Sequence, residues 1–273
     1  NAIVIDIKDY SGYLSYFVDE PLIKESGALK EPRILKPNTL IKRLHDKGIY
    51  VIGRISVFQD PILAAAHPEW AVKSSSTGSI WKDRKGLAWM DPASREAWEY
   101  NLLIAKDAIA RGFDEVNFDY IRFPSDGNLE DMVYPDWDEK RARHLVIRDF
   151  SSYLRENLGD AVLSADLFGL VTVAADDLGI GQALEDALPH FDYAAPMVYP
   201  SHYAPGVFGY ANPAVFPYEV VKNSLAGASF KIKNYEFGLP ENFSSSTLVS
   251  PSSSPGESSS ILPLIKVRRA RAK

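Results

Sequence analysis

Two aspartates lie inside segments whose composition otherwise predicts buried strands. Asp119 lies in residues 113–124, FDEVNFDYIRFP, and Asp166 lies in residues 161–168, AVLSADLF. Burying an ionised group without a partner costs on the order of several kcal/mol, so each carboxyl group needs a charged neighbour or a chemical task. The task that suits two carboxyl groups is glycoside hydrolysis, in which one attacks the anomeric carbon and the other, with a raised pKa, protonates the leaving oxygen.

Five segments have the composition of strands, and helical patterns separate them. The predicted strands are residues 2–8, 49–57, 115–121, 161–168 and 192–199. The predicted helices are residues 37–47, 92–111, 138–157, 179–189 and 215–226, with Asp91 placed to cap the second. Strands that alternate with helices predict parallel βαβ units. No glycine-rich phosphate-binding fingerprint follows the first strand, which favours a barrel over a dinucleotide-binding sheet.

The alternation of side chains along each strand places polar groups on one face. In chain order, that face carries Asp6, Lys8, Arg54, Asn117, Asp119 and Asp166. In a barrel these side chains converge at the C-terminal ends of the strands, where barrel enzymes have their active sites. Paired strands run about 4.8 Å apart, which suits the carboxyl separation of roughly 5–5.5 Å in retaining glycosidases. A structural network of ion pairs among Asp6, Lys8, Arg54, Asp119 and Asp166 is the alternative.

Aromatic side chains in two loops are candidates for binding a sugar. The long segment 58–91 carries Trp70, Trp81 and Trp89, and loops of this length are often functional. Tryptophan faces suit stacking on sugar rings, although packing of the loop onto its own domain is an equal alternative. Tyr199 and His202, in YPSHY (199–203), follow the fifth strand and are expected at the rim of the site.

The composition narrows the class of protein. With 273 residues, of which 46% are hydrophobic, the chain has the length of one α/β barrel. A net charge of −6 argues against a nucleic-acid partner. The chain has no cysteine, which excludes disulfides and thiolate ligands, and its histidines lack metal-ligand spacing. We therefore predict no metal and no cofactor, and no apolar run approaches the roughly 20 residues that span a bilayer. The oligomeric state stays open.

Several motifs together resemble a known family. They are NAIVIDIKDYSG (1–12), HPEWAV (67–72), GLAWMDP (86–92), FDEVNFDYIRFP (113–124), SADLFG (164–169) and YAAPMVYPSHY (193–203). They are similar to a bacterial family of unknown function described as a "putative glycosyl hydrolase domain", a distant relative of the α-amylase-like barrels. The resemblance covers residues 1–226 and implies a TIM barrel that acts on carbohydrate. It also suggests an exported or envelope protein, although no signal peptide precedes the first strand.

The resemblance assigns the strands to places in an incomplete (β/α)8 barrel. It matches Asp119 to the acidic position of the fourth barrel strand and Asp166 to that of the fifth. The first strand of this chain then corresponds to the second of the family, and the last two strands are not recognisable after residue 226. Residues 231–237 and 261–267 are poor substitutes for them. Residues 227–273, which include SSSTLVSPSSSPGESSS (244–260), are expected to form a disordered tail.

These observations predict a hydrolase that cleaves O-glycosidic bonds in a poly- or oligosaccharide. Asp119 is assigned as nucleophile or transition-state stabiliser and Asp166 as acid/base; the reverse assignment stays open, with Asp6 as a reserve acid. The predicted substrate-binding residues are Asp6, Lys8, Arg54, Trp89, Asn117, Arg122, Tyr199 and His202. Two alternatives are a barrel that binds carbohydrate without cleaving it and an inactive, truncated fragment.

Overall fold

Five parallel strands form the centre of the molecule, a computed structural model that describes residues 1–237 and 265–266. They are β1 (Ala2–Lys8), β2 (Tyr50–Ser56), β4 (Glu115–Asp119), β6 (Leu163–Phe168) and β7 (Tyr193–Met197). They pair in the order β1-β2-β4-β6-β7, and the short strand β8 (Ile265–Lys266) pairs antiparallel with β7. The described residues close no barrel. The prediction of an α/β protein with about five β/α units of a (β/α)8 barrel is therefore confirmed.

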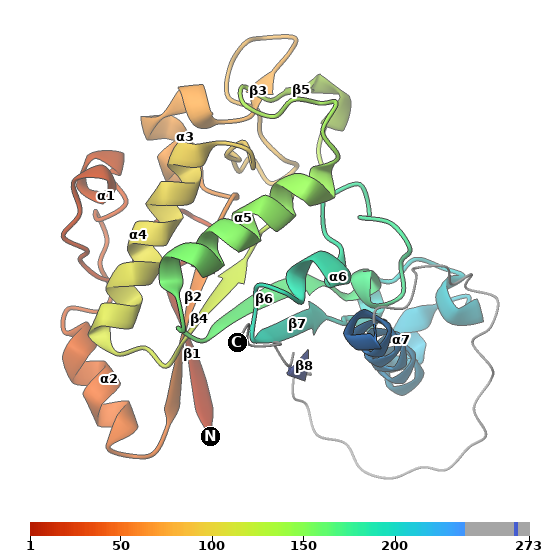
Figure 1. The fold of residues 1–273 in the computed structure, drawn as a ribbon. Helices are drawn as coiled ribbons and strands as arrows, with labels where there is room; N and C mark the ends of the chain where they lie inside the picture. The colour runs from red at the N-terminus through yellow and green to blue at the C-terminus, as the bar shows by residue number, and fades with distance from the viewer. Residues whose placement is uncertain (238–264, 267–273) are drawn as a thin grey trace.

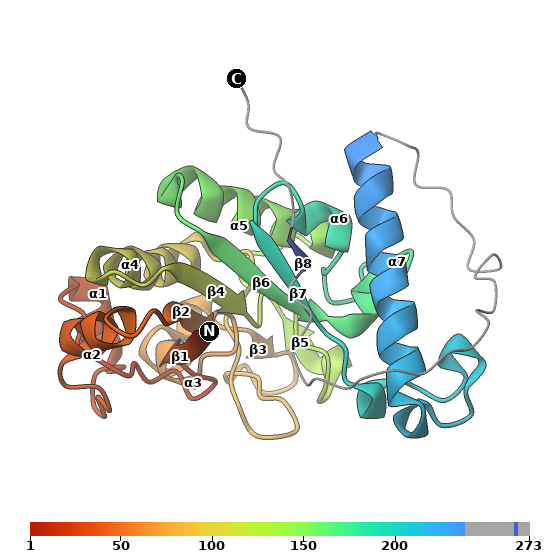
Figure 2. The same cartoon turned by 90° about the horizontal axis from the view of Figure 1, so that it is seen from below.

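Helices cover one face of this sheet (Figures 1 and 2). They are α2 (Pro37–His45), α4 (Arg95–Arg111), α5 (Arg143–Leu158), α6 (Leu184–Ala187) and α7 (Pro217–Phe237), and each packs against the next. Two short helices, α1 (Pro21–Ser26) and α3 (Pro61–Ala66), were not predicted. Within the described part of the chain, no helix combines the length and hydropathy needed to cross a bilayer.

Short elements lie in the connections. The antiparallel pair β3 (Lys73–Ser74) and β5 (Met132–Val133) stands above the sheet in Figure 1. The single turns of 3-10 helix are η1 (Pro68–Trp70), η2 (Leu129–Asp131), η3 (Gly169–Thr172), η4 (Pro200–His202), η5 (Val207–Gly209) and η6 (Pro213–Val215).

The core lies between the sheet and its helices. The apolar face that the alternation predicts is fully buried in β2, β4 and β6, as at Ile55, Phe118 and Leu163. Gly53 allows close packing at its position, because a Cβ there would lie 2.5 Å from Cδ1 of Ile7. The opposite face of the same strands is thereby left for the polar side chains.

Several predicted ends of elements were wrong. Helix α4 begins at Arg95, and Ser94 caps it by accepting the N–H of Ala97. Asp91 instead lies buried and accepts backbone N–H groups of the segment that leads into α5. Helix α7 runs across residue 226, where we expected the domain to end, because the helical pattern continues to Phe237. The rest of the expected tail lies outside the described residues, except for β8.

Candidate active site

The centre of the site is Arg54, which comes from β2 and holds three carboxylates. Its neighbours across the sheet are Asp6 on β1 and Asn117 on β4. Nη1 donates to Oδ1 of Asp6 at 2.7 Å, Nη2 donates to Oδ2 of Asp119, and Nε donates to Oδ2 of Asp166 at 3.4 Å. Burial lowers the pKa of Arg54, but the carboxylates of Asp119 and Asp6 outweigh burial and raise it. Arg54 is therefore a permanent cation between the two predicted catalytic groups.

Asp119 is the last residue of β4, and its side chain is only 6% exposed. One carboxylate oxygen accepts from Arg54 and the other accepts the backbone N–H of Tyr120 at 2.6 Å. Tyr120 has a φ of 54°, in the left-handed region that non-glycine residues seldom adopt. Such conformations cost on the order of 1–3 kcal/mol and cluster at functional sites. Asp119 is thus fixed in orientation by its own strand end.

Asp166 lies on the next strand, β6, and points into the same group of side chains. Nδ2 of Asn117 donates to Oδ1 of Asp166 and to Oγ of Ser164, both at 3.0 Å. Burial and the adjacent charge of Asp119 raise the pKa of Asp166 to about 6, against the opposing effect of Asn117 and Arg54. Ser164 was not among the predicted residues, although its position on the polar face next to Asn117 was a usable signal.

Tyr199 and His202 follow the end of β7, and Ala195 of that strand pairs with Asp166 across the sheet. The Tyr199 side chain is 41% exposed. Burial and the charges of Asp166 and Asp119 raise its pKa. The His202 ring lies 5.4 Å from the Tyr199 ring, and its Nδ1 contacts Oγ of Ser201 at 3.2 Å.

Lys8 was predicted to bind substrate, and this prediction was wrong. Its ammonium group is fully buried and donates to Asp60 at 2.7 Å and to Asn101 of α4 at 2.8 Å. The reason is an irregularity in the pairing of β1 with β2 between Asp6 and Lys8, which breaks the alternation and turns Lys8 towards the helices. Lys8 therefore belongs neither to the site nor to the ion pairs of Arg54.

Trp89 and Arg122 were also predicted to contact substrate, and both are buried. Trp89 is 2% exposed, and its indole N–H donates to the Asp83 carboxylate. The Arg122 guanidinium lies 4.7 Å from the Trp89 ring and 4.8 Å from that of Phe168. No sugar can stack on a ring whose face is already covered. These two residues pack the long loop onto the domain, which was the alternative for its tryptophans.

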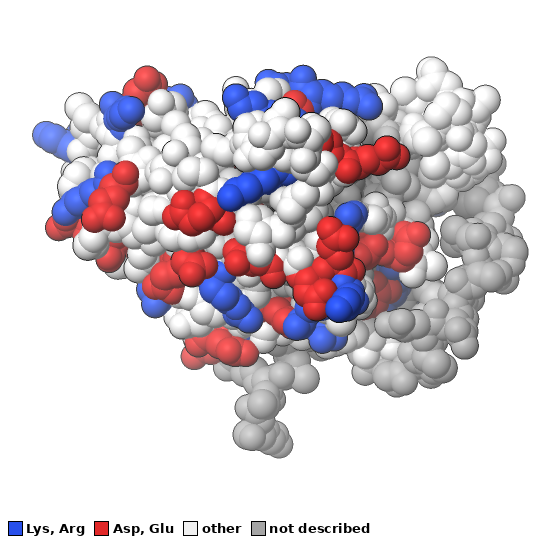
Figure 3. Space-filling view, turned by 90° about the horizontal axis from the view of Figure 1, so that it is seen from above, with Lys and Arg blue, Asp and Glu red and all other residues white. Residues whose placement is uncertain are grey.

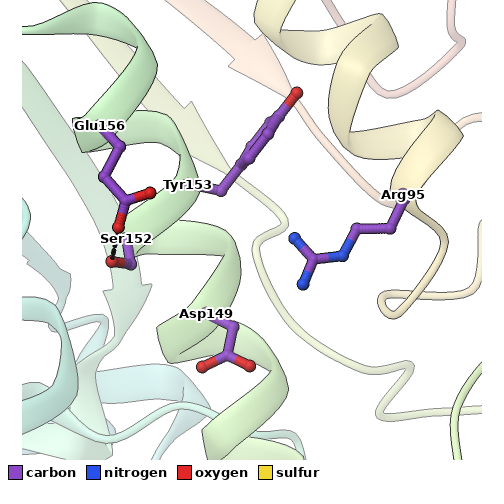
Figure 4. A pocket seen from close by; sticks show the side chains of 5 residues that line it. All are labelled: Arg95, Asp149, Ser152, Tyr153 and Glu156. Atoms are coloured by element: carbon purple, nitrogen blue, oxygen red, sulfur yellow. Dashed lines mark hydrogen bonds between the residues drawn. The ribbon is translucent and has the colours of Figure 1, made fainter.

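A separate pocket of about 220 Å³ lies in the helical layer (Figure 4). It is lined by Arg95, Asp149, Ser152, Tyr153 and Glu156, which come from α4 and α5. None of the predicted site residues lines it. Nor do the described residues group three or more His, Asp or Glu side chains in a way that could hold a metal ion.

Two acidic side chains thus lie on adjacent parallel strands, Asp119 at the C-terminal end of β4 and Asp166 within β6. Barrel enzymes have their active sites at the C-terminal ends of such strands. The chain belongs to the family described as "Putative glycosyl hydrolase domain", whose model matches residues 1–240. Membership of this family indicates a glycosidase-like function. A search of curated proteins found no match.

Solved structures similar to this chain include a hypothetical protein from Ruminiclostridium thermocellum ATCC 27405. It is 40% identical, with a TM-score of 0.54 over 66% of this chain and 85% of that one. An α-galactosidase from Thermus thermophilus in complex with stachyose is 19% identical, with a TM-score of 0.36 over 47% of this chain and 27% of that one. A maltogenic α-amylase from Thermotoga neapolitana is 14% identical, with a TM-score of 0.46 over 88% of this chain and 48% of that one. The chain thus spans at most about half the length of these two enzymes.

Proposed function

We propose that the chain hydrolyses O-glycosidic bonds in an oligo- or polysaccharide by means of Asp119 and Asp166. The observation that carries the proposal is that both carboxyl groups bond to one guanidinium, while the pKa of Asp166 is raised to about 6. A carboxyl group with a raised pKa suits general-acid catalysis. We therefore assign Asp166 as the acid and Asp119 as the nucleophile.

We propose a reaction in two steps with retention of configuration, because β4 and β6 are paired and paired strands run about 4.8 Å apart. An oxygen of Asp119 forms a bond to the anomeric carbon, the bond to the leaving oxygen breaks, and that oxygen takes the proton of Asp166. In the second step Asp166 accepts a proton from water as the water oxygen attacks the anomeric carbon. The bond to Asp119 breaks, and both side chains return to their starting states.

Arg54 and Asn117 position the two carboxyl groups for this chemistry. Arg54 bonds to both and so fixes the orientation of each relative to the other. Asn117 fixes the orientation of Asp166 by a hydrogen bond of 3.0 Å. Neither side chain exchanges a proton with the substrate, so we assign both as positioning residues.

A second candidate function is carbohydrate binding without cleavage. It is favoured by one observation, which is that Arg54 engages all three carboxylates at once. Carboxylates held in this way have the contacts of a structural network of ion pairs and take no part in chemistry. The polar groups around them would then bind a glycan without breaking any bond in it.

Release of reducing ends from a panel of glycans distinguishes the two functions. Asp119→Asn and Asp166→Asn should each lower the rate roughly 10²–10⁴-fold while glycan binding persists. Asp160→Asn is the matched control, because Asp160 is an exposed aspartate outside the site. Equal rates in Asp119→Asn and the parent would refute the assignment of the nucleophile. Binding without turnover in the parent would establish the second function.

A further inference from the structure

The segment between β7 and α7 differs in composition from the rest of the chain. Residues 199–218, here called the aromatic loop, contain no Asp, Glu, Lys or Arg, in a protein with 24% charged residues. They contain six aromatic residues: Tyr199, Tyr203, Phe208, Tyr210, Phe216 and Tyr218. In Figure 3, the area without charged side chains at the upper right of the molecule lies over this loop.

Several rings of the aromatic loop face solvent. The exposed fractions are 41% for Tyr199, 40% for Phe216 and 61% for Tyr218. The Tyr210 ring stacks on that of Phe216, with centroids 4.5 Å apart and an angle of 21° between planes. Soluble proteins seldom expose contiguous apolar area of this kind unless it binds something. Of this pair, Tyr210 carries a hydroxyl group at its edge, so the two rings offer apolar contact and Tyr210 also offers a hydrogen bond.

The loop is anchored from beneath at Tyr210, which packs against a small buried cluster and stacks on Phe216. Val198, Tyr203 and Val220 form a small buried cluster separate from the main core. The Tyr203 hydroxyl contacts the Ser224 hydroxyl of α7 at 2.9 Å. A surface that is already ordered loses little conformational entropy when a ligand binds.

The aromatic loop is continuous with the site carboxylates. Tyr199, its first residue, lies two residues beyond the end of β7, and Ala195 of β7 pairs with Asp166 across the sheet. The turn η4, which contains His202, packs against η6, and Phe216 follows η6 directly. The exposed rings therefore lead from the reacting groups towards the start of α7.

We infer that the aromatic loop binds successive sugar units of an uncharged polysaccharide as the chain leaves the catalytic carboxylates. This inference rests on the proposed function and adds the class of substrate. The apolar C–H faces of neutral sugar rings pack on aromatic rings, while tyrosine hydroxyls and the Asn212 amide can bond to sugar hydroxyls. The loop itself contains neither Lys nor Arg, although the Lys222 ammonium of α7 lies 5.8 Å from the centre of the Tyr218 ring. A polysaccharide with a carboxylate on every unit would therefore leave most of its charges without a partner here.

The test measures the mobility of the full chain in native gels that hold soluble starch, galactomannan, mixed-linkage β-glucan or polygalacturonate. The chain carries Asp119→Asn so that the polysaccharide stays uncut. We expect retardation by at least one of the three uncharged polymers and none by polygalacturonate. Phe216→Ala and Tyr218→Ala should each weaken binding about tenfold. Tyr235→Ala is the matched control and should bind normally: Tyr235 is 45% exposed on the same helix as Tyr218, about 25 Å further along.

Four results would overturn the inference: equal weakening by Tyr235→Ala, normal binding by both loop variants, no binding to any uncharged polymer, or tighter binding to polygalacturonate. Loss of a dimer in Tyr218→Ala, measured by sedimentation, would overturn it too by showing that the surface is a protein interface. Hydrolysis is measured separately with chains that retain Asp119, with and without the loop substitutions, and this measurement distinguishes the two proposals. Cleavage of oligosaccharides with no role for the loop leaves the proposed function intact, while loop-dependent binding without any cleavage leaves only the inference.

Discussion

The raised pKa of Asp166 predicts a specific dependence of stability on pH. The folded protein holds this proton more tightly than the unfolded chain, in which the pKa is near the ordinary 3.8. The pKa of Asp166 is about 6 in the folded protein, about two pH units above that in the unfolded chain. At about 1.4 kcal/mol per unit, this difference changes the free energy of unfolding by roughly 3 kcal/mol. The contribution is fully present below about pH 4 and is lost as the pH rises through about 6. The Asp166 side chain is only 18% exposed, so solvent screening reduces this contribution only slightly.

Asp166→Asn removes the titrating group and retains its shape. The free energy of unfolding of the parent chain, relative to that of the variant, should therefore fall by about 2–3 kcal/mol between about pH 4 and pH 7. Urea unfolding followed by tryptophan fluorescence at half-unit steps of pH measures the difference. Asp160→Asn, made on the exposed surface, controls for the general effect of losing one charge.

The direction of the change decides the chemistry. If the difference stayed flat or rose with pH, the ionised form of Asp166 would be the one that Arg54 and Asn117 stabilise. Asp166 would then hold no proton at the working pH and could not be the acid. The assignment of roles in the proposed reaction would fail with it.

Three further predictions follow from the same contacts. The rate of glycan hydrolysis should fall as the pH rises above about 6, since the acid loses its proton; a pH–rate profile that still climbs above neutrality would contradict this. Lys8→Met should lower the free energy of unfolding in urea by about 3–5 kcal/mol, because it leaves the buried Asp60 without its cation. It should not change the pH–rate profile of hydrolysis. A shifted profile would show that Lys8 acts in the site. Gly53→Ala should cost about 1–3 kcal/mol in thermal unfolding by forcing a Cβ against Ile7; unchanged stability would show that Ile7 can move aside.

The polar face of the strands was predictable because alternation is a local property of extended backbone. Asp6, Arg54, Asn117, Asp119 and Asp166 all lie where a period of two places them, and the structure brings them together. A separate rule predicts which strands are neighbours, because the strands of consecutive βαβ units usually pair in parallel.

The same rule was wrong at Lys8 for an identifiable reason. The end of β1 pairs with β2 on one side and forms an antiparallel bridge with Leu14 on the other. A register shift at that point reverses the direction of every following side chain. Nothing in residues 2–8 alone distinguishes a strand that shifts from one that does not.

The sequence alone determined the α/β class, the order of the strands and the face on which the acidic groups lie, because these depend on local periodicity and on neighbours along the chain. Only the tertiary structure decided which of the candidate side chains are accessible. Arg122 and Trp89 cover each other, while Tyr199 remains exposed. Exposure depends on segments that approach from distant parts of the chain, and so does the raised pKa of Asp166.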